Sequence, residues 1–112
     1  MPGGDAEPAL DRLIHEPARL AIMTVLSSVQ AADFTFLQRT TGLTKGNLSS
    51  HLTKLEEAGL VTIAKTFVGK KPNTRVKLTG TGTARIANHW AQLERLRSLA
   101  QPPAPRDSPD SR

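Results

Sequence analysis

The stretch Thr44–Val61, "TKGNLSSHLTKLEEAGLV", has the pattern of a single amphipathic helix with an unusual beginning. Leu48, Leu52 and Leu55 recur at the spacing of one buried helical face. Gly59 stands where a helix would stop in the left-handed conformation. The first two turns nevertheless hold Gly, Asn and Ser, which are poor helix formers, and a glycine inside a helix costs about 1 kcal/mol relative to alanine. The beginning of this helix therefore needs an explanation other than helix stability.

Two helices are expected before this stretch. The first covers Pro8–Ile14 and ends near His15–Glu16, because Pro17 disfavours helical geometry at the residue before it. The second is "PARLAIMTVLSS", which begins at Pro17 and is apolar around most of its circumference, as a buried central helix would be. Next, "FTF" is expected to form a very short strand and "FLQRTTG" a short helix. A tight "GLT" turn then leads to the quoted helix, with Thr44 as its N-cap.

The residues after Gly59 predict a β-hairpin and one more helix. "LVTIAKTFV" is rich in β-branched residues, "GKKPN" is expected to turn the chain, and "TRVKLT" alternates between apolar and basic side chains. Thr79 is expected to cap a last helix over 80–100, which Gly80 and Gly82 weaken at its start. The tail over 101–112 and residues 1–7 are expected to be disordered, which leaves one folded domain over 8–100.

Composition and charge narrow the classes of function. The chain has 112 residues and no cysteine, so disulfides, thiolate metal sites and a cysteine nucleophile are excluded. No apolar run is long enough for a membrane span, and no secretory signal is recognised, so we expect a cytoplasmic protein without a membrane partner. The net charge is +5, and residues 44–79 hold seven basic but only two acidic residues. This concentration fits a surface for phosphate backbones, although a solvated lysine face explains the charge alone equally well.

The order of helix, helix, helix-turn-helix, hairpin and helix resembles a small prokaryotic winged-helix transcriptional regulator of the MarR/ArsR type. The match is carried by the segment from Phe34 to Gly82, above all by "LSSHLTKLEEAGLV", the basic hairpin and "LTGTG". The resemblance implies an α+β, mostly α fold, which is a winged helix-turn-helix with a two-stranded β-wing and flanking N- and C-terminal dimerisation helices. Thiolate metal sensing, known in ArsR-like proteins, is not implied, because this chain has no cysteine.

A role in DNA binding explains the unusual helix start. A recognition helix presents its N-terminal residues to base edges in the major groove, and small side chains let the backbone come close. Lysine can bind guanine and asparagine can bind adenine through two hydrogen bonds. The candidate DNA-binding residues on the helix are Lys45, Gly46, Asn47, Ser49, Ser50, Thr53 and Lys54, and those on the hairpin are Lys70, Lys71, Asn73 and Arg75. Lysines in a hairpin also protect a sheet edge against aggregation, so the hairpin lysines can bind DNA and protect the edge at the same time.

A homodimer is expected to form through the first and last helices. Its candidate interface residues are Leu10, Leu13, Ile14, Ile86, Trp90, Leu93 and Leu96. Trp90 is interpreted as a dimer or core residue, with an effector pocket beside it as the alternative. His51 is expected to pack or to form hydrogen bonds, whereas His15 and His89 would form an intersubunit metal or pH site if the chain ends pack together.

The predicted function is sequence-specific binding of double-stranded DNA at a pseudo-palindromic operator, by a dimeric repressor without cofactor or metal. Repression is the default because no separate activation domain is recognised. A winged helix used for protein–protein binding, and a ligand-responsive sensor with an effector pocket at the dimer interface, remain alternatives. No effector can be named. The sequence shows no phosphate loop, nucleophile elbow or carboxylate pair, so no enzyme activity is expected.

Overall fold

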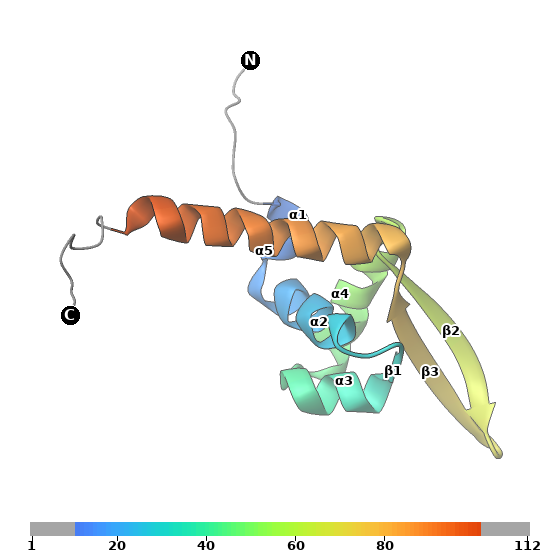
Figure 1. Ribbon diagram of the computed structural model, residues 1–112. Coiled ribbons are helices and arrows are strands. Elements are labelled where there is room, and N and C mark those ends of the chain that lie inside the picture. Colours follow the sequence, from blue (N-terminus) through green and yellow to red (C-terminus); the bar gives the residue numbers. More distant parts are fainter. Residues whose placement is uncertain (1–10, 102–112) are drawn as a thin grey trace, which may run out of the picture.

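The computed structural model describes residues 11–101, which form five helices and a small antiparallel sheet (Figure 1). The helices are α1 (Arg12–His15), α2 (Pro17–Ser27), α3 (Phe34–Thr41), α4 (Lys45–Glu57) and α5 (Gly80–Ala100), and the strands are β1 (Ala32–Asp33), β2 (Val61–Val68) and β3 (Lys71–Leu78). The expected winged-helix fold, mostly helical with a two-stranded wing, is confirmed. The predictions for residues 1–7, for Pro8 and Leu10, and for residues 102–112 lie outside the described residues.

Each helix begins at a side chain that accepts a hydrogen bond from its first turn. The five N-caps are Asp11, Glu16, Asp33, Thr44 and Thr79. Such a cap satisfies a backbone N–H group that has no partner within the helix. The caps expected at Thr44 and Thr79 are therefore confirmed, and the break before Pro17 is present.

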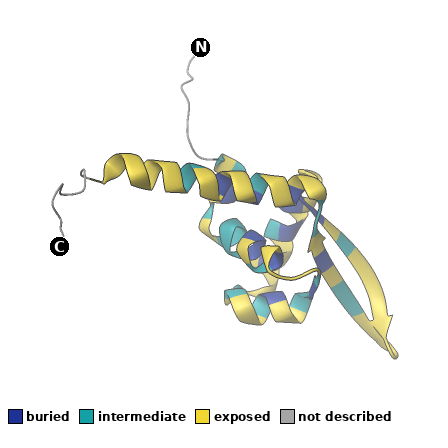
Figure 2. Ribbon diagram, in the orientation of Figure 1, coloured by how far each residue is buried: buried dark blue, intermediate teal, exposed yellow. Residues whose placement is uncertain are grey.

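The core lies where α2, α3 and α4 pack together beneath α5 and the base of the sheet (Figure 2). The central helix α2 contributes Ile22, Met23 and Leu26, as its all-round apolar pattern predicted. The helix-turn-helix consists of α3, a turn at Gly42 and α4, and Gly42 adopts a φ of 76° that suits glycine. At the other end of α4, Gly59 has a φ of 77°, so the expected left-handed stop is confirmed.

Two expected boundaries are wrong. The "FTF" segment is not a strand but the first turn of α3, and the strand before it is Ala32–Asp33, which pairs with Val76 and Arg75 of β3. The first helix is also shorter than expected, because its N-cap is Asp11 and its first residue is Arg12. In both places a capping aspartate starts the helix.

The hairpin turn is tighter than the sequence predicted. Only Gly69 and Lys70 lie between the strands, and Lys71 pairs with Val68 as the first residue of β3. Next to that pair, Pro72 lies opposite Phe67. In a two-residue hairpin the pair that flanks the turn, here Val68 and Lys71, is a hydrogen-bonded pair, and the next pair is not. The Pro72 nitrogen therefore points away from β2, where a missing N–H group costs no ladder bond. The segment expected to be a loop therefore extends the wing.

Gly82 has a structural role that the sequence did not indicate. It is buried in the first turn of α5, where a β-carbon would overlap the Leu60 carbonyl group. The Leu60 oxygen also accepts a hydrogen bond from the Thr79 N–H group at 3.0 Å. The glycine is thus needed for the close approach of α5 to the start of β2, rather than merely weakening the helix.

Candidate nucleic-acid interface

Helix α4 divides into a buried apolar face and an exposed polar face. Leu48, Leu52 and Leu55 are all buried in the core, as their spacing predicted. The candidate DNA-binding residues on this helix are all exposed, namely Lys45, Gly46, Asn47, Ser49, Ser50, Thr53 and Lys54. Thr44 accepts a hydrogen bond from the Asn47 N–H group at 3.1 Å, which fixes the exposed first turn.

Hydrogen bonds of one arginine connect α4 to the two N-terminal helices. The Arg19 guanidinium donates to the Leu13 carbonyl oxygen at 2.6 Å and lies 3.2 Å from His51 Nδ1. Arg19 thereby connects α1, α2 and α4, and the Glu16 carboxylate lies 4.0 Å from the same ring nitrogen. The expected hydrogen-bonding role of His51 is confirmed, and the contact fixes α4 relative to the rest of the domain.

Gly46 has no role in the packing of the chain. A β-carbon at this position would meet no atom of the structure within 4 Å. The fold itself therefore does not require glycine here, although glycine weakens the helix. Its small size leaves open space on the outer side of α4.

The wing has two faces of different chemistry, which the strand register defines. Residues directly opposite each other in an antiparallel pair point to the same side of the sheet. The side that faces α4 carries the pairs Ile63–Val76, Lys65–Thr74 and Phe67–Pro72. The outer side carries the pairs Ala64–Arg75, Thr66–Asn73 and Val68–Lys71. The predicted residues Asn73 and Arg75 therefore lie on the side of the wing away from α4.

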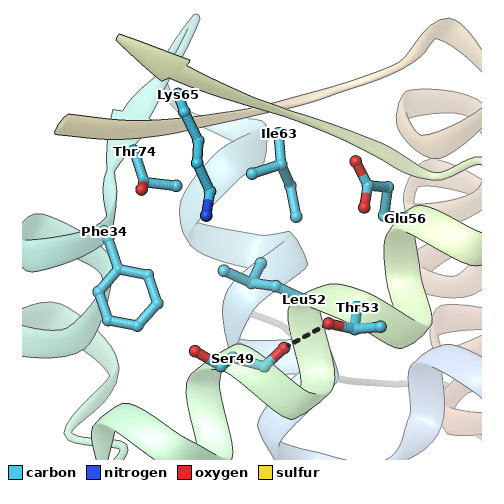
Figure 3. Close-up of a pocket in the computed structure, with 8 residues that line it drawn as sticks. All are labelled: Phe34, Ser49, Leu52, Thr53, Glu56, Ile63, Lys65 and Thr74. Atoms are coloured by element: carbon cyan, nitrogen blue, oxygen red, sulfur yellow. Dashed lines mark hydrogen bonds between the residues drawn. The ribbon is translucent and has the colours of Figure 1, made fainter. Parts of the chain in front are cut away.

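A groove with a volume of about 350 Å³ lies between the wing and the two helices of the helix-turn-helix (Figure 3). The lining residues are Phe34, Ser49, Leu52, Thr53, Glu56, Ile63, Lys65 and Thr74. The Lys65 side chain extends from β2 toward α4, with Thr74 beside it and Leu52 between it and the hydroxyl-bearing residues Ser49 and Thr53. Lys65 was not among the predicted site residues, although its place two residues from both Ile63 and Phe67 puts it on their face of the strand and could have indicated it.

The predicted dimer residues divide between the core and the surface. Ile14 and Ile86 are wrong as interface residues, because both are buried within one chain and have no surface left for a partner. Leu13 and Leu93 are half-buried, and Trp90 and Leu96 are each 39% exposed. The second half of α5 extends beyond the rest of the domain (Figure 1).

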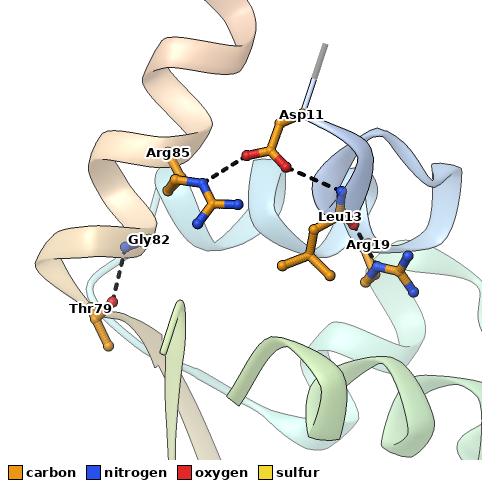
Figure 4. A network of polar contacts seen from close by, with 6 residues as sticks. All are labelled: Asp11, Leu13, Arg19, Thr79, Gly82 and Arg85. Carbon is orange, nitrogen blue, oxygen red and sulfur yellow. Dashed lines mark hydrogen bonds and ion pairs between the residues drawn. The ribbon is translucent and has the colours of Figure 1, made fainter. Parts of the chain in front are cut away.

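The short helix α1 is fixed to α5 by one ion pair and one pair of histidines. Arg85 donates to the Asp11 carboxylate at 2.7 Å, and this bond lowers the pKa of the Asp11 carboxyl (Figure 4). His15 and His89 approach within one chain, with their ring centroids 5.4 Å apart. His89 is fully buried, and neither ring nitrogen has a hydrogen-bond partner among the described residues. Burial, with a smaller effect from His15, lowers the pKa of His89.

Residues 11–101 show neither a metal-ligand cluster nor a membrane-spanning helix. This part of the chain contains no group of three or more His, Cys, Asp or Glu side chains placed to hold a metal ion. Among its helices, none combines the length and the hydropathy that crossing a membrane requires.

The comparisons with known proteins agree with this geometry. Residues 18–97 match the winged helix DNA-binding domain family, and the chain belongs to that family. A transcriptional regulator homologue from Pyrococcus horikoshii OT3 is 32% identical, with a TM-score of 0.75 over 81% of this chain and 91% of the other. The uncharacterised protein MJ0432 from Methanocaldococcus jannaschii is 29% identical over 85 residues, which are 76% of this chain and 92% of the relative.

The resemblance to MarR-type regulators is also confirmed at the level of the fold. A MarR family transcriptional regulator from Silicibacter pomeroyi has a TM-score of 0.64 at 16% identity, over 80% of this chain and 58% of the other. The matching family is a DNA-binding domain, and these two solved structures are a transcriptional regulator homologue and a transcriptional regulator. Together they support a DNA-binding regulator.

Proposed function

We propose that the protein is a homodimeric transcriptional regulator that binds a pseudo-palindromic operator in double-stranded DNA and represses by occupying it. The observation that carries this proposal is the exposed, small and basic N-terminal face of α4, held rigidly from behind by three buried leucines. A helix with this distribution fits the major groove with its first turns toward the bases. The wing then lies beside it, where Lys70 and Lys71 at its tip meet phosphates.

The dimer is supported by the apolar surface of α5. Trp90, Leu96 and Leu99 are exposed on a helix whose residues 94–100 are all exposed within the described part of the chain, and Leu99 is 77% exposed. A helix of 21 residues is about 31 Å long, so α5 as a whole is long enough to pack against the α5 of a second copy. Two copies related by a two-fold axis would present two α4 helices to successive major grooves, about 34–36 Å apart.

The oligomeric state is open to a direct test. The double change Trp90→Ala, Leu96→Ala should convert the dimer to a monomer and weaken operator binding, because one α4 helix alone loses the second half-site. The exposed alanine pair Ala84 and Ala87, changed to serine, is the matched control on the part of α5 near its start. Light scattering that shows a monomeric wild type at micromolar concentration would contradict the dimer.

Asn47 provides the test of base reading. Asn47→Ala should cost about 1–3 kcal/mol on the selected operator and relax the preference at one base pair. Asn88→Ala is the matched control, since Asn88 is equally an exposed helical asparagine but lies on α5. Fluorescence anisotropy with labelled operator measures both. Equal affinities for the wild type and Asn47→Ala, together with an unchanged selected motif, would refute the groove assignment.

The alternative of a winged helix that binds only other proteins predicts a different result. Such a protein would show weak, sequence-independent affinity for DNA, and the exposed face of α4 would be neutral to substitution. The charge of residues 44–79 favours DNA, because this segment holds seven basic residues against two acidic ones.

A further inference from the structure

The tip of the wing exposes an aromatic side chain that the fold does not explain. Phe67 is 71% exposed and Val68 is 66% exposed, and the hairpin carries both away from the body of the domain (Figure 1). Lys70 and Lys71 lie beside them at the turn. A large apolar side chain so far from the core gains nothing from the chain's own packing.

The strand register places Phe67 on a surface shared with the groove. Ile63, Lys65 and Phe67 follow one another on the side of β2 that faces α4, and the opposed residues of β3 are Val76, Thr74 and Pro72. Along this side the burial decreases from Val76, which is fully buried, to Phe67 and Pro72, which are exposed. The exposed aromatic ring is therefore the outer continuation of the groove wall that holds Lys65.

Lys65 has a free charge in this groove. Within residues 11–101 it forms no ion pair, and Thr74 provides a hydroxyl group beside it in the groove. Glu56 lines the same groove, but Figure 3 shows it on the other side of Ile63 from Lys65. The end of the groove at Lys65 and Thr74 is thus the end that suits an anion.

We propose that the groove between α4 and the wing grips one strand of the DNA backbone, with Lys65 binding a phosphate and Phe67 packing against the neighbouring deoxyribose. This inference rests on the proposed function and assigns two further residues to it. Positions two apart in a strand are separated by about 6.6 Å, so the two side chains can meet adjacent groups of one backbone. Pro72, opposite Phe67, would extend the apolar contact.

The two contacts should affect the salt dependence of operator affinity differently. A phosphate contact releases counterions, so log affinity falls with log salt concentration by about 0.9 for each phosphate bound. An apolar contact with a sugar releases none. Lys65→Ala should therefore weaken binding and reduce the slope by about one unit, whereas Phe67→Ala should weaken binding at least fivefold with the slope unchanged.

The outer side of the wing supplies matched controls. Val68→Ala removes an equally exposed apolar side chain from the opposite face, and Lys77→Ala removes a lysine that pairs with Thr62 on that face. Both should change affinity less than twofold. Lys65→Arg keeps the charge and should retain the wild-type slope. Thermal unfolding should be unchanged in every variant, because these side chains are exposed.

The experiment is fluorescence anisotropy of the purified full chain with labelled operator between 50 and 200 mM salt, on the scale at which phosphate contacts are resolved. The proposal is supported if only Lys65→Ala and Phe67→Ala lose operator affinity and if only Lys65→Ala reduces the slope of log affinity against log salt concentration. It is overturned if the wild type binds its operator but these two variants lose no more affinity than Val68→Ala and Lys77→Ala. A wild type that binds no DNA would instead refute the proposed function itself.

Discussion

Replacing Gly46 by alanine should make the protein more stable and a weaker DNA binder. Glycine inside a helix costs up to about 1 kcal/mol relative to alanine, and a β-carbon at this position would meet no atom within 4 Å. No steric penalty therefore offsets the gain. For a domain of this size, 1 kcal/mol corresponds to a rise in melting temperature of about 4–8 °C, and the position in the first turn places the expected shift at the lower end.

The expected effect on binding has the opposite sign. If the backbone of α4 lies against the bases, the added methyl group overpacks the contact, which costs about 1–3 kcal/mol by analogy with protein cores. Affinity for the operator should then fall between about fivefold and 150-fold. Thermal unfolding by circular dichroism and anisotropy with labelled operator measure the two effects on one preparation. A more stable variant with unchanged affinity would refute the idea that this glycine is kept for close approach to DNA.

Three further predictions concern the contacts that hold the domain together. Gly82→Ala should destabilise the fold by about 1–3 kcal/mol in urea denaturation, because the new β-carbon would overlap the Leu60 carbonyl group. The free energy of unfolding should fall as the pH drops below about 6.5, because the unfolded chain takes up a proton at His89 before the folded chain does. His89→Leu should remove this pH dependence of stability, and an unchanged pH dependence in the variant would contradict the role of His89. Asp11→Asn keeps an oxygen to cap α1 but removes the charge opposite Arg85, so the free energy of unfolding should fall by less than about 1 kcal/mol at pH 7. This difference between variant and wild type should vanish in acid, where the wild-type carboxyl is also protonated.

Features set by residues close in sequence could be predicted well. The start of α5 follows from Thr79 as a cap, and the buried face of α4 follows from the spacing of its leucines. The stop at Gly59 follows from the conformational freedom of glycine. These signals act within one or two turns of helix, so they need no knowledge of the tertiary structure.

Features that depend on distant contacts could not be predicted. Helical spacing shows that Ile86 shares a face with Trp90, but it does not show that Ile86 is buried in its own chain and Trp90 is exposed. The need for glycine at position 82 arises from Leu60, more than 20 residues away. The tight turn of the wing follows from a register that only the paired strands define.

Selection of bound sequences from a random DNA library by the purified full chain is the decisive experiment for a dimer that reads DNA through two α4 helices. Such a dimer should enrich one motif with two half-sites related by two-fold symmetry, their centres one helical turn or a multiple of about 10–10.5 base pairs apart. The same selection with Asn47→Ala should relax one position in each half-site. Recovery of no enriched motif, or of a motif without internal symmetry, would contradict a dimer that reads DNA through two α4 helices.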